Sequence, residues 1–311
     1  MVSSNGVAWN FQNTTNARSL GAVIFAEGRF LGAGDGGRLA ESLDGTNWVD
    51  RESGLSGELI ALAHGPSGYL AGGSLQGSGV IYHSTDGSSW QTVLNLPGRP
   101  VRAIASGAGR IAAVASGPLD LGVVAVSTNG LAWEVQETAQ RYSNLIFAQG
   151  LFVAVGADGA VGTSSDGRAW DVISITTNRL ATVAHGAGVF LAAGDSKLGE
   201  AWSSPDAIHW VRHLTGQALE FRASAFGRRS FLLAGTAGWV LHSDLVRPEL
   251  GIRAETGQAV VRFADPVNQP LDIERSSDLL HWERLPAGQS GELREPLAGS
   301  AAFYRVRAPA P

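Results

Sequence analysis

Arginine recurs at corresponding places in this chain, within a pattern that repeats about every 40 residues. A guanidinium group donates paired hydrogen bonds to a carboxylate, so several converging arginines would favour an acidic ligand. The pattern therefore predicts a polar site for an acidic or sugar-like ligand or a peptide carboxylate. An alternative interpretation is that these charges only keep surface loops solvated. The candidate ligand-binding residues are Arg18, Glu58, Arg102, Arg141, Tyr142, Arg179, Glu220, Arg222 and Trp239.

The remaining residues form no other recognisable catalytic or metal-binding set. The chain has no cysteine, which excludes a thiol nucleophile, a disulfide framework and a cysteine-ligated metal. Its seven histidines lack the spacing of metal ligands, and no Ser–His–Asp set lies in a strand-to-helix elbow. Glycine-rich runs such as 34–37 are not followed by a helix and cannot cradle phosphate. We therefore expect no cofactor, no metal and no catalytic residues.

Charge and hydropathy restrict the kind of partner. The net charge of −5 gives no general affinity for nucleic acid or for an anionic membrane surface. No apolar run reaches the length of a membrane span, and residues 1–6 lack the features of a signal peptide. We expect a monomer whose partner is a protein or glycan ligand, without nucleic-acid binding or membrane insertion.

A seven-residue box provides the framework that would position the candidate residues. Its pattern is Ser, any residue, Asp or Asn, usually Gly, two further residues and Trp. The Asp or Asn is expected to accept hydrogen bonds from its own turn, and Gly to supply a positive φ. The Ser hydroxyl can tie the strand end to this turn, while Trp fills the gap between neighbouring sheets. The predicted structural residues are Asn5, Trp9, Asp44, Trp48, Asp86, Trp90, Asn129, Trp133, Asp166, Trp170, Asp206 and Trp210.

The spacing of the boxes indicates the fold. Successive box tryptophans are 37 to 43 residues apart, which suits a blade of four short strands. Between boxes, strand-length apolar runs are separated by glycine turns, as in 23–31, 145–153 and 182–191. These runs show no helical periodicity, so the sequence predicts an antiparallel meander in each repeat.

The boxes resemble the Asp-box (BNR) repeats of β-propellers, which occur in sialidases, photosystem-assembly propellers and many exported bacterial proteins. The resemblance covers roughly residues 1–245, although the usual box has one more residue between Asp and Gly. It implies that each box joins the third and fourth strands of a blade, on the face opposite the ligand site. It also implies that ligands sit over the central channel, so the candidate residues would surround one mouth of that channel.

The resemblance to sialidases also raises an enzyme alternative. A sialidase uses three arginines on the substrate carboxylate, a tyrosine nucleophile assisted by glutamate, and an aspartate acid–base. Here Arg18 lacks the Ile-Pro that follows the first sialidase arginine, and the period never exceeds 43 residues, leaving no large catalytic loops. Tyr142 aligns with Leu20 and Leu59 in an apolar column, which favours a packing role.

Six inner sets of three strands predict six blades, beginning near Leu20, Leu59, Val101, Tyr142, Leu180 and Phe221. The last set has no box strand after it, so the strand around Trp9 is expected to pair with it and close the ring. Closure removes exposed sheet edges. A seven-bladed ring is the alternative, because 276–282 is another box whose Trp282 lies 72 residues after Trp210.

The run Arg247-Pro248-Glu249 breaks the repeat and predicts a boundary between a propeller at 1–246 and a small β-sandwich-like domain at 247–311. Six strand-length runs are expected in this tail. Its segments 271–282 and 303–307 resemble small C-terminal β-domains of exported verrucomicrobial and planctomycete proteins. That resemblance implies an extracytoplasmic bacterial protein, secreted, periplasmic or at the cell surface, whose leader is not present in this chain.

The sequence therefore predicts an all-β fold, a six-bladed β-propeller followed by a small β-domain. The predicted function is a non-catalytic, exported binding scaffold that recognises a protein or glycan ligand at the channel mouth. Two alternatives remain open, a sialidase-like glycoside hydrolase and a purely structural cell-surface or assembly protein.

Overall fold

The computed structural model describes residues 19–117, 121–215, 220–227, 229–243, 249–255, 258–264, 272–276, 280–285, 290–296 and 303–307. These residues form β-strands and three short 3-10 turns, η1 (Asp35–Gly37), η2 (Ala157–Gly159) and η3 (Thr236–Gly238). None of the helical segments in these ranges could cross a membrane. The chain divides into two compact units, of which the second holds Ser243–Pro311 together with Gly186–Val189 and Phe226–Phe231.

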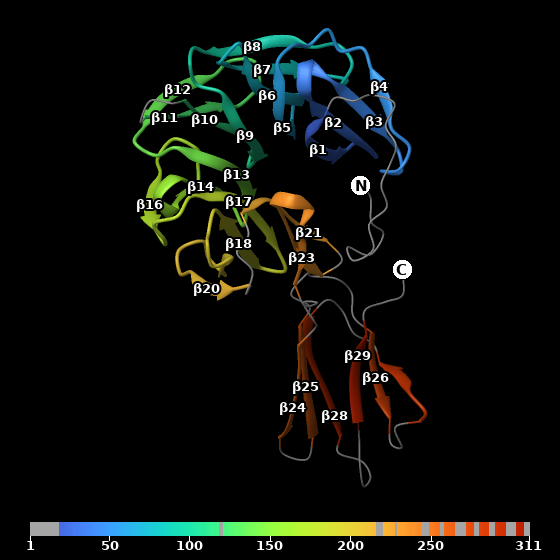
Figure 1. Ribbon diagram of the computed structural model, residues 1–311. Coiled ribbons are helices and arrows are strands. Elements are labelled where there is room, and N and C mark those ends of the chain that lie inside the picture. Colours follow the sequence, from blue (N-terminus) through green and yellow to red (C-terminus); the bar gives the residue numbers. More distant parts are fainter. Residues whose placement is uncertain are drawn as a thin grey trace. The chain divides into compact units, whose positions relative to one another are not determined.

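The described residues up to 242 form a series of antiparallel meanders in which each sheet follows the order of the chain (Figure 1). Five sheets have four strands, and the sixth has three among the described residues. The strands are β1 (Leu20–Ala26), β2 (Arg29–Gly34), β3 (Leu39–Ser42), β4 (Val49–Arg51); β5 (Glu58–Gly65), β6 (Gly68–Leu75), β7 (Ser78–Ser84), β8 (Gln91–Leu96); β9 (Val101–Gly107), β10 (Arg110–Ser116), β11 (Gly122–Ser127), β12 (Glu134–Thr138); β13 (Tyr142–Ala148), β14 (Leu151–Gly156), β15 (Ala160–Ser164), β16 (Asp171–Ser174); β17 (Leu180–Gly186), β18 (Val189–Gly194), β19 (Glu200–Ser204), β20 (Val211–Leu214); β21 (Phe221–Gly227), β22 (Ser230–Gly235) and β23 (Val240–His242).

The predicted strand around Trp9 and the first box at 3–9 lie outside the described residues. Closure of the ring by that strand, and with it the number of blades, therefore stays a prediction.

The middle strands of these sheets are buried on both faces because each sheet is covered by its neighbours. In β10 and β14 nearly every residue is buried, whereas all residues of the fourth strands β16 and β20 are exposed. Such strands are continuous apolar runs instead of alternating ones. One core cluster joins Leu31 of the first sheet to Leu59 and Tyr69 of the second. The sheets are thus held together face to face, with first strands β1, β5, β9, β13 and β17 on the inner side (Figure 1).

Each complete box in the described residues forms one hydrogen-bonded turn. In the box at 84–90, Asp86 Oδ1 accepts hydrogen bonds from the backbone N–H groups of Ser88 and Ser89 at 2.8 and 2.9 Å. Ser84 Oγ accepts from Gly87 N–H at 2.9 Å, and Trp90 Nε1 donates to the Gly87 carbonyl at 3.1 Å. The boxes that begin at Ser42, Ser127 and Ser164 repeat these four bonds.

The box at 204–210 differs because Ala207 replaces the glycine. Asp206 Oδ1 still accepts from the backbone of Ile208 and His209. Ala207 has a φ of 61°, a left-handed conformation that costs about 1 kcal/mol for a residue with a Cβ. In the described part of the chain, the buried Trp210 Nε1 has no hydrogen-bond partner.

The second unit contains two three-stranded antiparallel sheets, in the orders β24-β25-β28 and β27-β26-β29. Each strand overlaps one of the six runs expected in the tail. The boundary at residue 246 and a sandwich-like packing of the two sheets stay predictions. The strands are β24 (Glu249–Glu255), β25 (Gln258–Ala264), β26 (Asp272–Ser276), β27 (Glu283–Leu285), β28 (Ser290–Pro296) and β29 (Phe303–Arg307).

Candidate functional site

A β-bulge recurs near the start of the inner strands. In the first sheet Leu20 pairs with Gly34 and Ala22 with Ala33, so Gly21 is an extra residue without a partner in the register. The same shift occurs in β5, β9 and β13. A bulge bends its strand and redirects the side chain of the extra residue. The residues at this position, which we call the mouth ring, all line central cavities and are Gly21, Ile60, Arg102, Ser143, Ala181 and Arg222.

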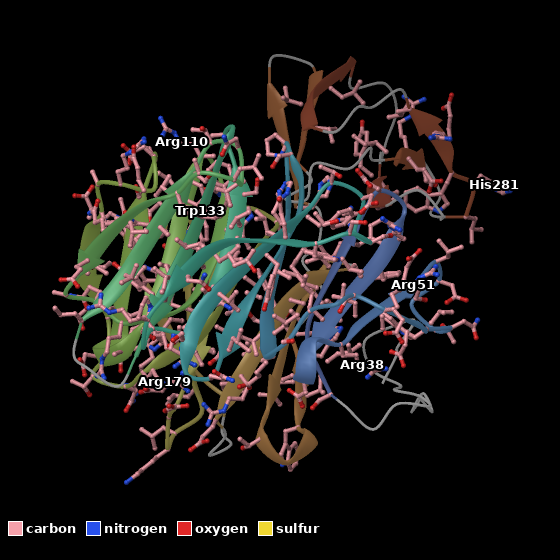
Figure 2. All side chains as sticks on the ribbon, turned by 90° about the horizontal axis from the view of Figure 1, so that it is seen from above. Arg38, Arg51, Arg110, Trp133, Arg179 and His281 are labelled. Atoms are coloured by element: carbon pink, nitrogen blue, oxygen red, sulfur yellow. The ribbon has the colours of Figure 1, made fainter. Side chains whose placement is uncertain are left out.

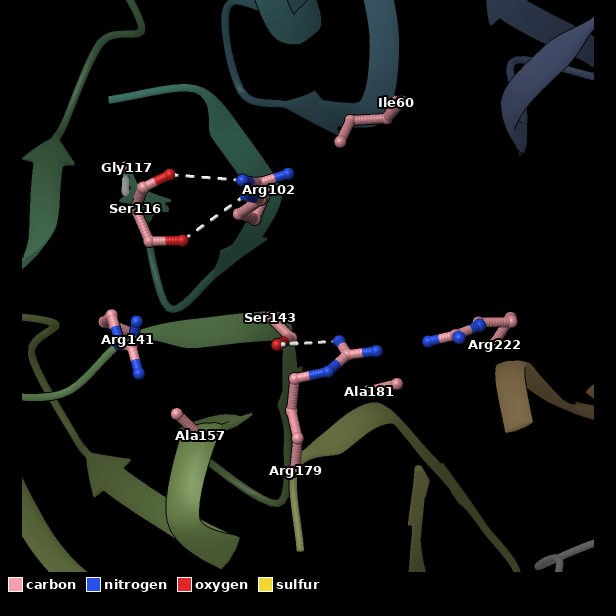
Figure 3. Close-up of a pocket in the computed structure, with 10 residues that line it drawn as sticks. All are labelled: Ile60, Arg102, Ser116, Gly117, Arg141, Ser143, Ala157, Arg179, Ala181 and Arg222. Carbon is pink, nitrogen blue, oxygen red and sulfur yellow. Dashed lines mark hydrogen bonds between the residues drawn. The ribbon is translucent and has the colours of Figure 1, made fainter. Parts of the chain in front are cut away.

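Four arginines from four successive sheets line one cavity of about 440 Å³, here called the mouth cavity. Arg102 and Arg222 belong to the mouth ring, while Arg141 and Arg179 directly precede β13 and β17. Figure 3 shows the four side chains around a common space. Four of the nine predicted ligand-binding residues are therefore brought together.

Two of these arginines carry charge that no carboxylate of the described residues balances. Arg102 donates only to Ser116, from Nε to the hydroxyl and from Nη2 to the carbonyl, both at 3.3 Å (Figure 3). The side chain of Arg141 has no hydrogen-bond or ion-pair partner among the residues that the structure describes. Both guanidinium groups can therefore donate to an anion.

The other two arginines are paired. Arg179 donates to both oxygens of Asp195, at 2.9 and 3.2 Å, and to Ser143 Oγ at 3.3 Å. Arg222 donates to Asp195 at 3.0 Å and to Glu220 at 2.5 Å. Two positive charges thus meet two carboxylates. Since these groups are between a third and a half exposed, each pair contributes at most about 1 kcal/mol to stability.

Tyr142 does not line the mouth cavity, which corrects its prediction as a ligand-binding residue. It is 1% exposed and its ring lies 5.6 Å from that of Trp170, between centroids. The bulge in β13 directs Ser143 toward the channel and leaves Tyr142 in the core. Burial raises the pKa of Tyr142 to about 12, and its hydroxyl has no partner within the described part of the chain. Tyr142 is therefore not an accessible nucleophile.

The remaining candidates contribute less directly or not at all. Glu220 reaches the site through Arg222, whereas the exposed Glu58 at the start of β5 lines neither central cavity. Trp239 is half exposed beside η3 and also lies outside both cavity linings. Arg18 falls outside the described residues. No group of His, Asp and Glu side chains in the described ranges could hold a metal ion.

The structure adds Ser116, Ser143 and Asp195 to the site. Asp195 follows Gly194 at the end of β18, as Asp35 follows Gly34 at the end of β2. This repeated Gly-Asp pair was a sequence signal for Asp195. The two serines had no comparable signal, because their position depends on strand pairing.

A second cavity of about 440 Å³, here called the channel cavity, adjoins the first. The two cavities share Ile60, Arg102, Ser143, Ala181 and Arg222 in their linings. The arginine mouth therefore continues into the channel between the inner strands.

Comparison with known proteins identifies the fold. No family model and no curated protein matches the chain. Its fold is similar to YCF48 bound to D1 peptide, with 18% identity over 93% of this chain and 97% of that chain and a TM-score of 0.54. The WD40 domain of Neurospora crassa Pan2 has 10% identity over 79% of this chain and 86% of that chain, with a TM-score of 0.55. The β-propeller domain of Myceliophteria thermophila Cps50 (Swd1) has 13% identity over 82% of this chain and 96% of that chain, with a TM-score of 0.56. These likenesses, together with the all-β sheets, show that the chain has a β-propeller fold.

Proposed function

We propose that this protein is a non-catalytic binding scaffold that recognises an acidic group of its ligand at the mouth cavity. The observation that carries the proposal is the pair Arg102 and Arg141, which share one cavity and lack a carboxylate partner among the described residues. A ligand carboxylate placed there would receive charge-assisted hydrogen bonds from both. The volume of about 440 Å³ lies within the range of small-ligand sites.

A protein partner is the favoured source of this acidic group. One propeller of similar fold is a complex with a peptide, YCF48 bound to D1 peptide. A peptide supplies carboxylates at its C-terminus and its acidic side chains, and either would suit the paired guanidinium groups. An acidic glycan is the second source and shares the same chemistry.

The sialidase-like alternative has less support. The arginines could hold a substrate carboxylate, but the tyrosine beside them, Tyr142, is buried and keeps its proton because burial raises its pKa to about 12. A purely structural role would not explain why Arg102 and Arg141 line one cavity without a carboxylate partner among the described residues.

Three further features belong to this proposal and come from the sequence. They are membership of the Asp-box propellers, a bacterial origin with location outside the cytoplasm, and a tail domain starting at 247. The repeated hydrogen bonds of the boxes support the first. Fractionation of cells that produce the chain from its native gene tests the second.

The test is a binding screen on an array of acidic glycans and of peptides with free or amidated C-termini, with a sialidase-substrate assay on the same sample. We expect anionic ligands to bind without turnover, and Arg141→Ala to weaken binding at least tenfold. Arg110→Ala is the matched control for Arg141→Ala. Arg141 lines the mouth cavity together with Arg179, and Arg110 and Arg179 lie at opposite ends of the propeller strands (Figure 2). Turnover that disappears in Arg179→Ala would overturn the non-catalytic proposal. Equal loss of binding in Arg141→Ala and in the control Arg110→Ala would overturn the proposed site.

A further inference from the structure

Two serine hydroxyl groups of the mouth cavity have protons that no described residue accepts. Ser116 and Ser143 both line this cavity. Their Oγ atoms accept hydrogen bonds from Arg102 and Arg179 respectively, both at 3.3 Å. A hydroxyl group that accepts from one partner can still donate its own proton. Ser116 is only 9% exposed, so packing fixes the position of this donor. Both hydroxyl groups are therefore available to a ligand in the cavity.

The two guanidinium groups without a carboxylate partner add further donors. Arg102 uses Nε and Nη2 for Ser116, and its Nη1 donates to no described residue. The five N–H groups of Arg141 are unused within the described part of the chain. Figure 3 shows both arginines and both serines around one space. The donors available around this space thus exceed the roughly four lone-pair sites that a carboxylate offers.

The charge of the site also exceeds that of one carboxylate. Four arginines line the mouth cavity, and the carboxylates that pair with them among the described residues are Asp195 and Glu220. Two positive charges are left over, which correspond to Arg102 and Arg141. A carboxylate carries one negative charge, whereas a phosphate monoester carries about 1.5 to 2 at neutral pH and has three strong acceptor oxygens. A phosphate monoester therefore matches the site in charge and in acceptor capacity.

We propose that the mouth cavity binds a phosphate monoester, as its dianion, in preference to a carboxylate. The phosphate oxygens accept hydrogen bonds from the guanidinium groups of Arg102 and Arg141. They also accept from the hydroxyl groups of Ser116 and Ser143. This inference rests on the proposed function for the anion site and adds the identity of the acidic group. Because the proposed partner is a protein, a phosphorylated side chain is the favoured source, and a sugar phosphate is the alternative that shares its chemistry.

Three small anions test the preference on the intact protein. The probes are methyl phosphate, methyl sulfate and butanoate, titrated at pH 7.5 and constant ionic strength. We expect methyl phosphate to bind at least tenfold more tightly than butanoate. Methyl sulfate has the same shape as methyl phosphate but a single charge, and its affinity should lie between the other two.

The variant Arg141→Ala makes failure of this inference distinguishable from failure of the proposed function. Equal affinity for methyl phosphate and butanoate, with both weakened at least tenfold in Arg141→Ala, would overturn this inference and leave the proposed function standing. Affinities that are all unchanged in Arg141→Ala would overturn both.

The pH dependence of the two ester anions separates charge from shape. The second ionisation of a phosphate monoester has a pKa of about 6, so the fraction of dianion rises about tenfold from pH 5 to pH 7.5. The affinity for methyl phosphate should rise by a similar factor, whereas methyl sulfate keeps one charge throughout. Methyl sulfate also reports any titration of the ionisable groups around the cavity, which are the four arginines with Asp195 and Glu220. The same pH dependence for both esters would overturn the proposal.

The substitution Ser143→Ala separates the hydroxyl donors from the arginines. Loss of a hydrogen bond to a charged group should weaken methyl phosphate binding about tenfold. Butanoate, whose oxygens the arginines already satisfy, should be nearly unaffected. Ser143→Thr keeps the hydroxyl group and should retain the affinity. Ser89→Ala, at an exposed position of the box at 84–90, is the matched control and should change neither anion. An equal loss for both anions in Ser143→Ala would overturn the proposed contact between this hydroxyl group and phosphate.

Competition against methyl phosphate distinguishes the two sources of the phosphate group. The competitors are a short peptide that carries phosphoserine, the same peptide without phosphate, and glucose 6-phosphate. Tighter binding of the phosphopeptide than of methyl phosphate, without displacement by the unphosphorylated peptide, supports the protein source. Tighter binding of the sugar phosphate alone would overturn the protein source and support a sugar as the carrier. Equal displacement by the two peptides would overturn the preference for phosphate.

Discussion

Asp195 Oδ1 accepts a hydrogen bond from Arg222 Nη1 at 3.0 Å, although the two residues belong to neighbouring sheets. The same carboxylate is also bound by Arg179. Asp195 and Glu220 thus balance the charge on one side of the mouth cavity. On the other side Arg102 meets only the neutral Ser116, so an incoming anion is directed there and toward Arg141.

Asp195→Asn should therefore strengthen anion binding. The substitution leaves Arg179 and Arg222 less compensated, so the affinity for butanoate should rise about three- to tenfold at low salt. The gain should shrink as salt is added, because the cavity is open to solvent. Titrations at two salt concentrations measure both effects. A butanoate affinity that falls in Asp195→Asn, or a gain that does not depend on the salt concentration, would contradict this electrostatic account.

Tyr142→Phe should leave the free energy of unfolding unchanged or raise it by up to about 1 kcal/mol. The hydroxyl it removes is buried and unpaired in the described part of the chain. Tyr82→Phe is the matched control, since Tyr82 donates to the Ser56 carbonyl at 3.1 Å and its loss should cost about 1 kcal/mol. Chemical denaturation measures both. Anion binding should be unaffected in both variants. Loss of anion binding in Tyr142→Phe alone would show that Tyr142 is a ligand-binding residue, which contradicts its place in the core.

The box at 84–90 should make stability depend on pH in the acidic range. The backbone N–H groups of Ser89 and Ser88 lower the pKa of Asp86 from 3.8 to about 2. Because the pKa is lower in the folded state, the stabilisation is present above about pH 4 and is lost as the pH falls toward 2. Unfolding midpoints measured from pH 5 to pH 2 should fall less steeply in Asp86→Asn than in the original chain.

The control for this pH effect is Glu52→Gln, which removes an exposed carboxylate outside the boxes. Asn129 already occupies the equivalent position in another box and accepts the same backbone bonds, so asparagine fits there. The account fails if Asp86→Asn and Glu52→Gln show the same slope with pH.

The strands of the repeats could be predicted closely because apolar runs and glycine turns are local signals. The inner strands expected near Val101 and Leu180 begin at those residues, and the one expected near Leu59 begins at Glu58. Every turn that the boxes were expected to form at Asp44, Asp86 and Asp166 has the corresponding hydrogen bonds. These bonds span no more than a few residues, so the sequence alone determines them.

The site could be predicted only in part. Arginines before β13 and β17 were recognisable, but the directions of the side chains at the start of β13 depend on the bulge at Ser143. That bulge is set by pairing with the neighbouring strand and has no signature in the local sequence. For the same reason Ser143 was missed and Tyr142 was placed in the site. The pairing of Asp195 with Arg222, which lies 27 residues further along the chain, requires two neighbouring sheets to meet.

The affinity of butanoate for the original chain, Arg141→Ala and Arg110→Ala, observed by NMR titration, tests the central claim most directly. The claim is that an acidic group binds at the mouth cavity. The account predicts that Arg141→Ala weakens binding at least tenfold and that Arg110→Ala, which removes the same charge at the opposite end of the strands, leaves it unchanged. Equal affinities of the two variants would contradict it.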